Sequence, residues 1–148
     1  MNKIKWTTAI ALVAGIAATG LWAHGGVTNE AVLARMERMK AISGQMKVPS
    51  QTVKGEREFD AATIEAVLER LSAEAGEVVP LFQAEEYDPK SEALPAIWSD
   101  FDGFTEEADA LAAAVTQWRG QVTDRAAAQE ALMDIGQTCK SCHDSYRE

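Results

Sequence analysis

The feature that most constrains the fold is a set of four segments in which apolar residues recur every three or four positions. This spacing places the apolar side chains on one face of an α-helix, whereas a half-buried strand needs alternation at every second residue. No segment of the 148-residue chain alternates strictly enough to predict a strand. Because amphipathic helices bury their apolar faces against one another, the sequence predicts an all-α fold, an antiparallel four-helix bundle.

The ends of these helices are marked by capping residues, glycine and proline. Asp60 is a suitable N-cap, since its carboxylate can accept hydrogen bonds from the first backbone N–H groups of a helix. Pro49 and Pro80 are expected to end the first two helices, because proline has no N–H to donate. Residues 83–95 are expected to form a charged surface loop. The predicted helices run from Asn29 to Lys47, from Asp60 to Pro80, from Ile97 to Gly120, and from Thr123 or Asp124 to near the end of the chain.

The N-terminal segment has the layout of a secretory signal peptide. Lys3 and Lys5 precede an uncharged apolar run over residues 9–21, which is shorter than the roughly 20 residues of a membrane-spanning helix. We expect residues 1–23 to be removed after Ala23, leaving residues 24–148 as a single exported domain without a membrane span. A retained membrane anchor is the alternative, because Leu21 is a large residue for the −3 position of a cleavage site.

The charge of the chain limits its partners. Its net charge is −9 at pH 7. Nucleic-acid binding needs clustered Lys and Arg side chains that neutralise phosphates, so no nucleic-acid partner is expected. A charged protein partner is expected to be basic.

The chemistry of the sequence is concentrated in the segment Cys139-Lys140-Ser141-Cys142-His143. It holds both cysteines of the chain in a C-x-x-C-H pattern, which is typical of covalent c-type haem attachment. On a helix, residues three and four apart share a face. Both thiols can therefore form thioethers with the two vinyl groups of one haem, while the imidazole of His143 binds the iron as proximal ligand.

Two other uses of these residues remain open at this point. A redox-active dithiol enzyme would normally place its C-x-x-C pair at the start of a helix that follows a strand, and here the pair ends an all-helical chain. A zinc site needs four ligands, and beyond Cys139, Cys142 and His143 the sequence offers only His24 as a further Cys or His ligand, at the expected cleavage boundary. The sequence thus favours a haem protein that is not an enzyme.

Four segments resemble the class II c-type cytochromes, the cytochrome c′ family: "ARMERMKA", "VKGEREFDAATI", "PAIWSDFDGF" and "CKSCHDSYR". The resemblance covers nearly all of residues 24–148. It implies a periplasmic protein that carries one covalently attached haem c near its C-terminus, with the porphyrin packed inside the bundle. Members of the family are often homodimers.

The resemblance also implies where the distal side of the haem lies. In the family the distal residue follows an arginine by four positions on the first helix, which selects Arg35 and Met39. In low-spin members a methionine here binds the iron, and the protein carries single electrons to and from a redox partner. In five-coordinate members an apolar residue shields an open site that takes NO or CO. We predict His143 and Met39 as the axial ligands; Met36 is a second candidate, and Met39 as an ordinary core residue is the alternative.

A second arginine, Arg147, lies one helical turn beyond His143. The resemblance places it by the proximal face of the haem, so that Cys139, Cys142, His143, Arg35 and Arg147 are the predicted cofactor-binding residues. The alternative for Arg147 is a cation that simply favours the C-terminus of a helix. Two aromatic side chains, Phe82 and Trp98, are expected to pack beside the haem or the helix ends. Lys54 and Arg57 are expected to be solvated.

Overall fold

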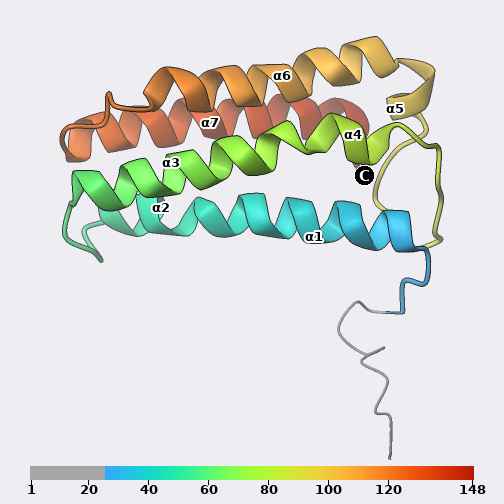
Figure 1. Ribbon diagram of the computed structural model, residues 1–148, viewed down its shortest axis with the longest axis horizontal. Coiled ribbons are helices and arrows are strands. Elements are labelled where there is room, and N and C mark those ends of the chain that lie inside the picture. The colour runs from blue at the N-terminus through green and yellow to red at the C-terminus, as the bar shows by residue number, and fades with distance from the viewer. Residues whose placement is uncertain (1–25) are drawn as a thin grey trace, which may run out of the picture.

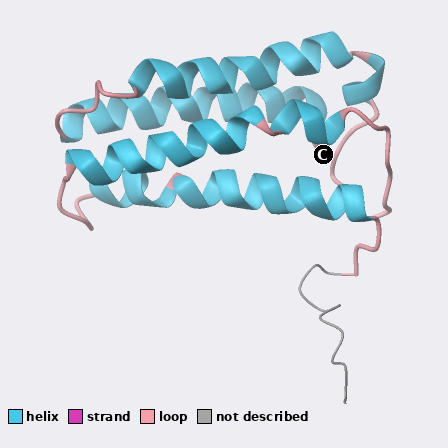
Figure 2. Cartoon of the chain, in the orientation of Figure 1, coloured by secondary structure: helices cyan, strands magenta, loops and turns pink. Residues whose placement is uncertain are grey.

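The computed structural model describes residues 26–148, so the predicted signal segment 1–23 and His24 lie outside the described residues. Within the described part, the regular elements are helices (Figure 2). They are α1 (Glu30–Gln45), α2 (Lys47–Val53), α3 (Ala61–Gly76), α4 (Val78–Phe82), α5 (Ala96–Ser99), α6 (Phe101–Trp118) and α7 (Arg125–Tyr146).

These helices form four long rods that run alternately in opposite directions (Figure 1). The first rod is α1 followed by α2, the second is α3 followed by α4, and α6 and α7 are the third and fourth. The predicted all-α, antiparallel four-helix bundle is confirmed. None of the helices in residues 26–148 is long and apolar enough to cross a membrane.

Two of the rods are interrupted by a proline in the same way. Pro49 is the third residue of α2 and Pro80 is the third residue of α4, positions where a backbone N–H has no intrahelical acceptor in any case. A proline has no N–H to donate to the carbonyl four residues earlier. For Pro49 that carbonyl belongs to Gln45, the last residue of α1, and for Pro80 it belongs to Gly76, the last residue of α3. Each helix therefore breaks there and restarts with the proline in its first turn. The prediction that these prolines end the helical segments is wrong.

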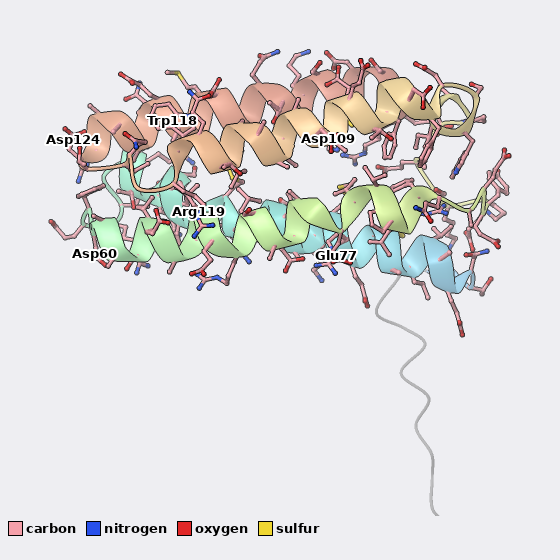
Figure 3. All side chains as sticks on the ribbon, turned by 45° about the horizontal axis from the view of Figure 1, so that its top comes forward. Asp60, Glu77, Asp109, Trp118, Arg119 and Asp124 are labelled. Atoms are coloured by element: carbon pink, nitrogen blue, oxygen red, sulfur yellow. The ribbon has the colours of Figure 1, made fainter. Side chains whose placement is uncertain are left out.

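Most other helix ends follow the predicted capping residues. The carboxylates of Asp60 and Asp124 accept hydrogen bonds from the backbone N–H groups of Thr63 at 3.0 Å and Ala127 at 2.8 Å. Figure 3 shows both caps at one end of the bundle, with Arg119 close by at the end of α6. Gly120 follows with φ of +71°, a left-handed conformation that glycine adopts without strain, as expected for the residue that ends a helix.

The third predicted helix begins differently. A short helix, α5, is followed by a break at Asp100, whose backbone leaves the helical region at φ −135° and ψ 55°. The carboxylate of Asp100 then caps α6 by accepting from the N–H of Gly103 at 3.4 Å. The sequence pattern missed this break because apolar spacing continues across it.

The hydrophobic core runs along the axis of the bundle. Its largest fully buried side chains include Phe104, Leu71, Ile97 and Ile135. On α1, Val32 is buried at 1% exposed, whereas Met36, one helical turn later, is 40% exposed. The exposure of Met36 has a structural cause, because it lies on the wall of a cavity.

The packing of the rods opens the bundle at one end. α6 packs against α3 and α7, α1 packs against α3 and α4, and α7 completes the bundle by packing against α2. The bundle is thereby closed at the end that holds α2. At the other end, where α1 begins and α7 ends (Figure 1), a cavity separates the two helices.

Candidate cofactor site

The cavity between α1 and the end of α7 has a volume of about 410 Å³. This is within the range of roughly 300–1,000 Å³ that is usual for ligand and cofactor pockets. The lining side chains come from α1 (Val32, Arg35, Met36, Met39, Lys40), from the end of α7 (Cys142, His143, Tyr146, Arg147) and from the chain between them (Phe82, Lys90, Ser91, Glu92, Ala93, Ile97, Phe104).

The wall formed by α7 carries the C-x-x-C-H residues. All of them lie within one continuous helix, so the spacing of three and four positions does place the thiols and the imidazole on one face. Cys142 and His143 line the cavity, and Cys139 lies half-buried against the hydrophobic core. Burial raises the pKa of the Cys142 thiol to about 11, with further contributions from the carboxylate of Glu107 and from Cys139. Cys139 and Cys142 form no disulfide, so both sulfur atoms can serve in haem attachment.

The surroundings of His143 favour the neutral form of its imidazole. It is half-buried, and this burial lowers its pKa, as does the nearby guanidinium of Arg147. The carboxylates of Asp144 and Glu92 act in the opposite direction but are the smaller causes. Because a metal binds the neutral imidazole, the site favours His143 as a ligand.

The opposite wall is the first part of α1 and carries both candidate methionines. Met39 is half-buried and packs against the hydrophobic core, whereas Met36 is exposed at the rim. Both line the cavity that His143 lines from the other side. The structure thus brings the predicted distal and proximal residues to one site, and the assignment of Met39 as an iron ligand stays a prediction.

Arg35 is a buried charge with an unusual set of partners. It is 3% exposed, and its guanidinium donates to three backbone carbonyls: that of Leu81 at 2.9 Å, of Ala84 at 2.6 Å and of Glu86 at 2.9 Å. It also lies over the ring of Phe82, at 4.8 Å from the centroid. Burial lowers the pKa of Arg35. The main role that the structure shows for Arg35 is to hold the chain after α4 against α1. Contact between Arg35 and a haem stays a prediction.

The aromatic side chains near Arg35 have the packing role that was expected. Trp98 stacks on the Arg35 guanidinium at 5.2 Å and donates its indole N–H to the carbonyl of Phe82 at 2.8 Å. Phe82 packs against Phe104 with 5.0 Å between ring centroids. On the remote loop, Lys54 and Arg57 are exposed, as predicted.

Residues 83–95, expected to be a surface loop, contribute to the site. Asp88 is 5% exposed and accepts hydrogen bonds from the backbone N–H groups of Thr28 and Lys90, each at 3.0 Å. Since these backbone bonds stabilise the ionised form, they lower the pKa of Asp88. The carboxylate thereby fixes the loop to the start of α1. No sequence pattern indicated this role, because Asp88 is one of several acidic residues in a charged loop.

The same loop also binds the end of the chain. Ala93 and Arg147 form an isolated antiparallel bridge, and the N–H of Leu94 donates to the carbonyl of Tyr146 at 3.0 Å. The guanidinium of Arg147 donates to the carboxylate of Glu92, with 2.6 Å between Nε and Oε2. The structure therefore places Arg147 at the cavity and pairs it with Glu92, a partner that no sequence pattern indicates. Contact between Arg147 and a haem stays a prediction.

The residues present fit a haem. Apolar side chains such as Val32, Ile97 and Phe104 form the inner wall, while basic groups and Glu92 lie around the cavity. A flat apolar ring with charged groups at one edge matches this division, and the thiols and imidazole on α7 match its attachment. Within residues 26–148, no group of three or more His, Cys, Asp or Glu side chains could hold a metal ion, so the zinc alternative gains no support.

The comparisons with known proteins agree with this geometry. The family model described as Cytochrome C' matches residues 30–147. Cytochrome c-556 of Agrobacterium fabrum is 32% identical over 146 residues, which cover 98% of this chain and 96% of that protein. Cytochrome c' of Rhodopseudomonas palustris is 30% identical over 140 residues, covering 93% and 94%.

Two similar solved structures extend the agreement to the fold. The oxidized cytochrome c556 of R. palustris has a TM-score of 0.74 at 27% identity, covering 82% of this chain and 98% of that one. A nitric oxide complex of a mutant cytochrome c prime from Alcaligenes xylosoxidans has a TM-score of 0.72 at 28% identity, covering 80% and 94%.

Proposed function

Because the chain belongs to the cytochrome c′ family, we propose that it is a periplasmic electron carrier whose haem iron is bound by His143 and Met39. The family is one of haem proteins that transfer electrons or bind gases, and it confirms the predicted cofactor, one covalently attached haem c. The choice between the two activities depends on the side of the iron opposite His143.

The observation that supports electron transfer is the position of Met39. It reaches the cavity from α1, whereas His143 reaches it from α7, and the cavity is the space that separates these helices. Met39 and His143 are thus the residues that would hold a haem iron bound in this cavity. Met39 is also the better buried of the two methionines, since Met36 is 40% exposed and lies at the rim. A buried thioether is easier to hold in one position than an exposed one.

The side chains of this chain would tune the bound haem, which supplies the one-electron change between ferric and ferrous iron. As a ligand, the thioether of Met39 would favour the ferrous state and so raise the reduction potential. The thiols of Cys139 and Cys142 would tether the ring, and the neutral imidazole of His143 would supply the proximal nitrogen. The apolar side chains around Phe104 would give the inner part of the haem an apolar surrounding.

The alternative is a five-coordinate protein that binds NO or CO. The similar A. xylosoxidans structure is a nitric oxide complex, and its fold matches this chain over 80% of its length. In that case Met39 would pack over an open coordination position without binding the iron. This alternative uses the same attachment residues and differs in Met39 alone.

Electron paramagnetic resonance of the oxidised holoprotein separates the two. If Met39 binds the iron, the wild type gives a low-spin signal, Met39→Ala gives a high-spin signal, and Met39→Ala gains CO binding in the reduced state. Met36→Ala is the matched control, because it removes a methionine three positions away on the same cavity wall; its signal should stay low-spin. A high-spin wild type would reject ligation by Met39, and CO binding by the reduced wild type would then support the gas-binding alternative.

Export and self-association are proposals that can be tested separately. The mature protein isolated from the periplasm should begin at His24 and lack residues 1–23. A chain that still begins at Met1 and stays with the membrane would contradict cleavage. Sedimentation of the holoprotein would show whether it forms the homodimer that is common in the family.

A further inference from the structure

We propose that Glu92 is a positioning residue that holds Arg147 and the end of α7 at the cavity, and that it thereby sets the reduction potential of the haem. This inference rests on the proposed function only in requiring a haem attached at His143. It holds equally for a six-coordinate and a five-coordinate iron. Glu92 had no predicted role, since it lies in the segment that was expected to be a surface loop.

The first observation is the pairing of side chains. Arg147 donates from Nε to Oε2 of Glu92 at 2.6 Å, and its Nη2 forms an ion pair with the same oxygen. Both side chains line the cavity beside His143. Since each is about half exposed, the ion pair by itself contributes little to stability. Its effect is to fix where the guanidinium lies.

The second observation is that the backbone of Glu92 binds the same end of the chain. Its carbonyl accepts from the N–H of Glu148 at 2.9 Å, and two residues later the N–H of Leu94 donates to the carbonyl of Tyr146 at 3.0 Å. These bonds hold the residues on either side of Arg147. The carboxylate of Glu92 thus acts on an arginine whose backbone is already held in place.

The third observation concerns charge. The side chains that line the cavity include four cations, Arg35, Lys40, Lys90 and Arg147, and one carboxylate, that of Glu92. A negative charge near the iron stabilises the ferric state, which carries one more positive charge than the ferrous state. The loss of the negative charge favours the ferrous state, so loss of Glu92 should raise the reduction potential, and the guanidinium of Arg147 also loses the partner that fixes its position.

The experiment compares the midpoint potentials of holoprotein variants by voltammetry at low ionic strength. Glu92→Gln removes the charge and keeps the shape. Glu85→Gln is the matched control, because Glu85 is an exposed residue of the same loop that does not line the cavity. We expect Glu92→Gln to shift the ferric–ferrous equilibrium toward ferrous by at least about threefold more than Glu85→Gln, which is about 28 mV at 59 mV per tenfold change.

A double-mutant cycle tests whether Glu92 acts through Arg147. In the Arg147→Gln background only the direct effect of the Glu92 charge on the iron remains, so the effect of Glu92→Gln should be smaller there than in the wild type. Equal shifts for Glu92→Gln and Glu85→Gln, or an undiminished effect of Glu92→Gln in the Arg147→Gln background, would overturn the proposal.

These outcomes are independent of the proposed function. A high-spin wild-type signal would reject the ligand role of Met39 and leave the potentials of the Glu92 variants measurable. Conversely, a low-spin wild type with unchanged potentials would reject the role of Glu92 alone.

Discussion

The hydroxyl of Tyr146 donates a hydrogen bond to the carboxylate of Asp100, with 2.9 Å between Tyr146 Oη and Asp100 Oδ2. The tyrosine is 8% exposed and packs edge-on against Phe104, at 5.5 Å between ring centroids. Asp100 also caps α6 through the N–H of Gly103. One carboxylate therefore fixes the start of α6 relative to the end of α7, three residues after His143.

Loss of the Tyr146 hydroxyl should change the stability of the protein at high pH. Burial, followed by the hydrogen bond and the negative charge of Asp100, raises the pKa of Tyr146 from 10.0 to about 12. The folded protein therefore keeps this proton at a pH where the unfolded chain has lost it. The stabilisation is complete below pH 10 and is lost as the pH rises through 12.

We expect the melting temperature of the wild type to fall more steeply between pH 10 and 12 than that of Tyr146→Phe. At pH 7 the same variant should melt a few degrees lower, because the hydrogen bond is missing. Calorimetry across this pH range measures both effects. Parallel curves for the two proteins would show that Tyr146 does not titrate in the way its surroundings imply.

Gly103 is required by the same contact. A Cβ atom at this position would lie 2.5 Å from Oδ2 of Asp100 and 2.7 Å from the hydroxyl of Tyr146. Gly103→Ala should therefore destabilise the protein, although alanine is favoured over glycine inside a helix by about 1 kcal/mol.

Gly136, in the middle of α7, is the matched control for Gly103. Apart from the backbone of its own helix, nothing lies within 4 Å of the place that a Cβ atom would take there. Gly136→Ala should therefore raise the free energy of unfolding by up to about 1 kcal/mol. Urea unfolding of both variants measures the contrast. Stabilisation by Gly103→Ala would mean that Asp100 and Tyr146 can move apart without cost.

Arg35→Lys should be strongly destabilising although it keeps the charge. The guanidinium satisfies three backbone carbonyls at once, and a single ammonium group cannot reach all three. We expect the free energy of unfolding to fall by about 3 kcal/mol, because buried carbonyls lose their donors. Arg57→Lys, at an exposed position, should have little effect. Equal stability of the two variants in urea would exclude a clamping role for Arg35.

Cofactor attachment should need at least one of the two cysteines. Holoprotein treated with acidified acetone should keep its haem, since thioethers survive this extraction. Cys139→Ser and Cys142→Ser should each keep haem through the remaining cysteine, and the double variant should release it. Absorption of the protein and solvent fractions measures the distribution. Colourless wild-type protein with two free thiols would reject haem attachment, whereas haem retained by the double variant would reject attachment through these thiols.

The fold was largely predictable because its determinants are local. Capping by Asp60 and Asp124 depends on backbone groups three residues away, and the spacing of Cys139, Cys142 and His143 depends only on helical geometry.

The errors have identifiable physical causes. Those at Pro49 and Pro80 are local, because a proline that cannot continue one helix is accepted in the first turn of the next. The break at Asp100 was missed for a different reason. Apolar spacing continues across it, and the hydrogen bond that Asp100 accepts from Tyr146 joins residues 46 apart in the sequence.

The sequence by itself determined the four helical segments and the chemistry of attachment, because both follow from spacing along one chain. Only the tertiary structure decided that α1 and the end of α7 are held apart around a cavity, with Met39 on one wall and His143 on the other. It also decided that Glu92 meets Arg147 and that Asp88 meets Thr28, over separations of 55 and 60 residues. Such contacts depend on how four helices pack together, and no periodicity within a single helix contains that information.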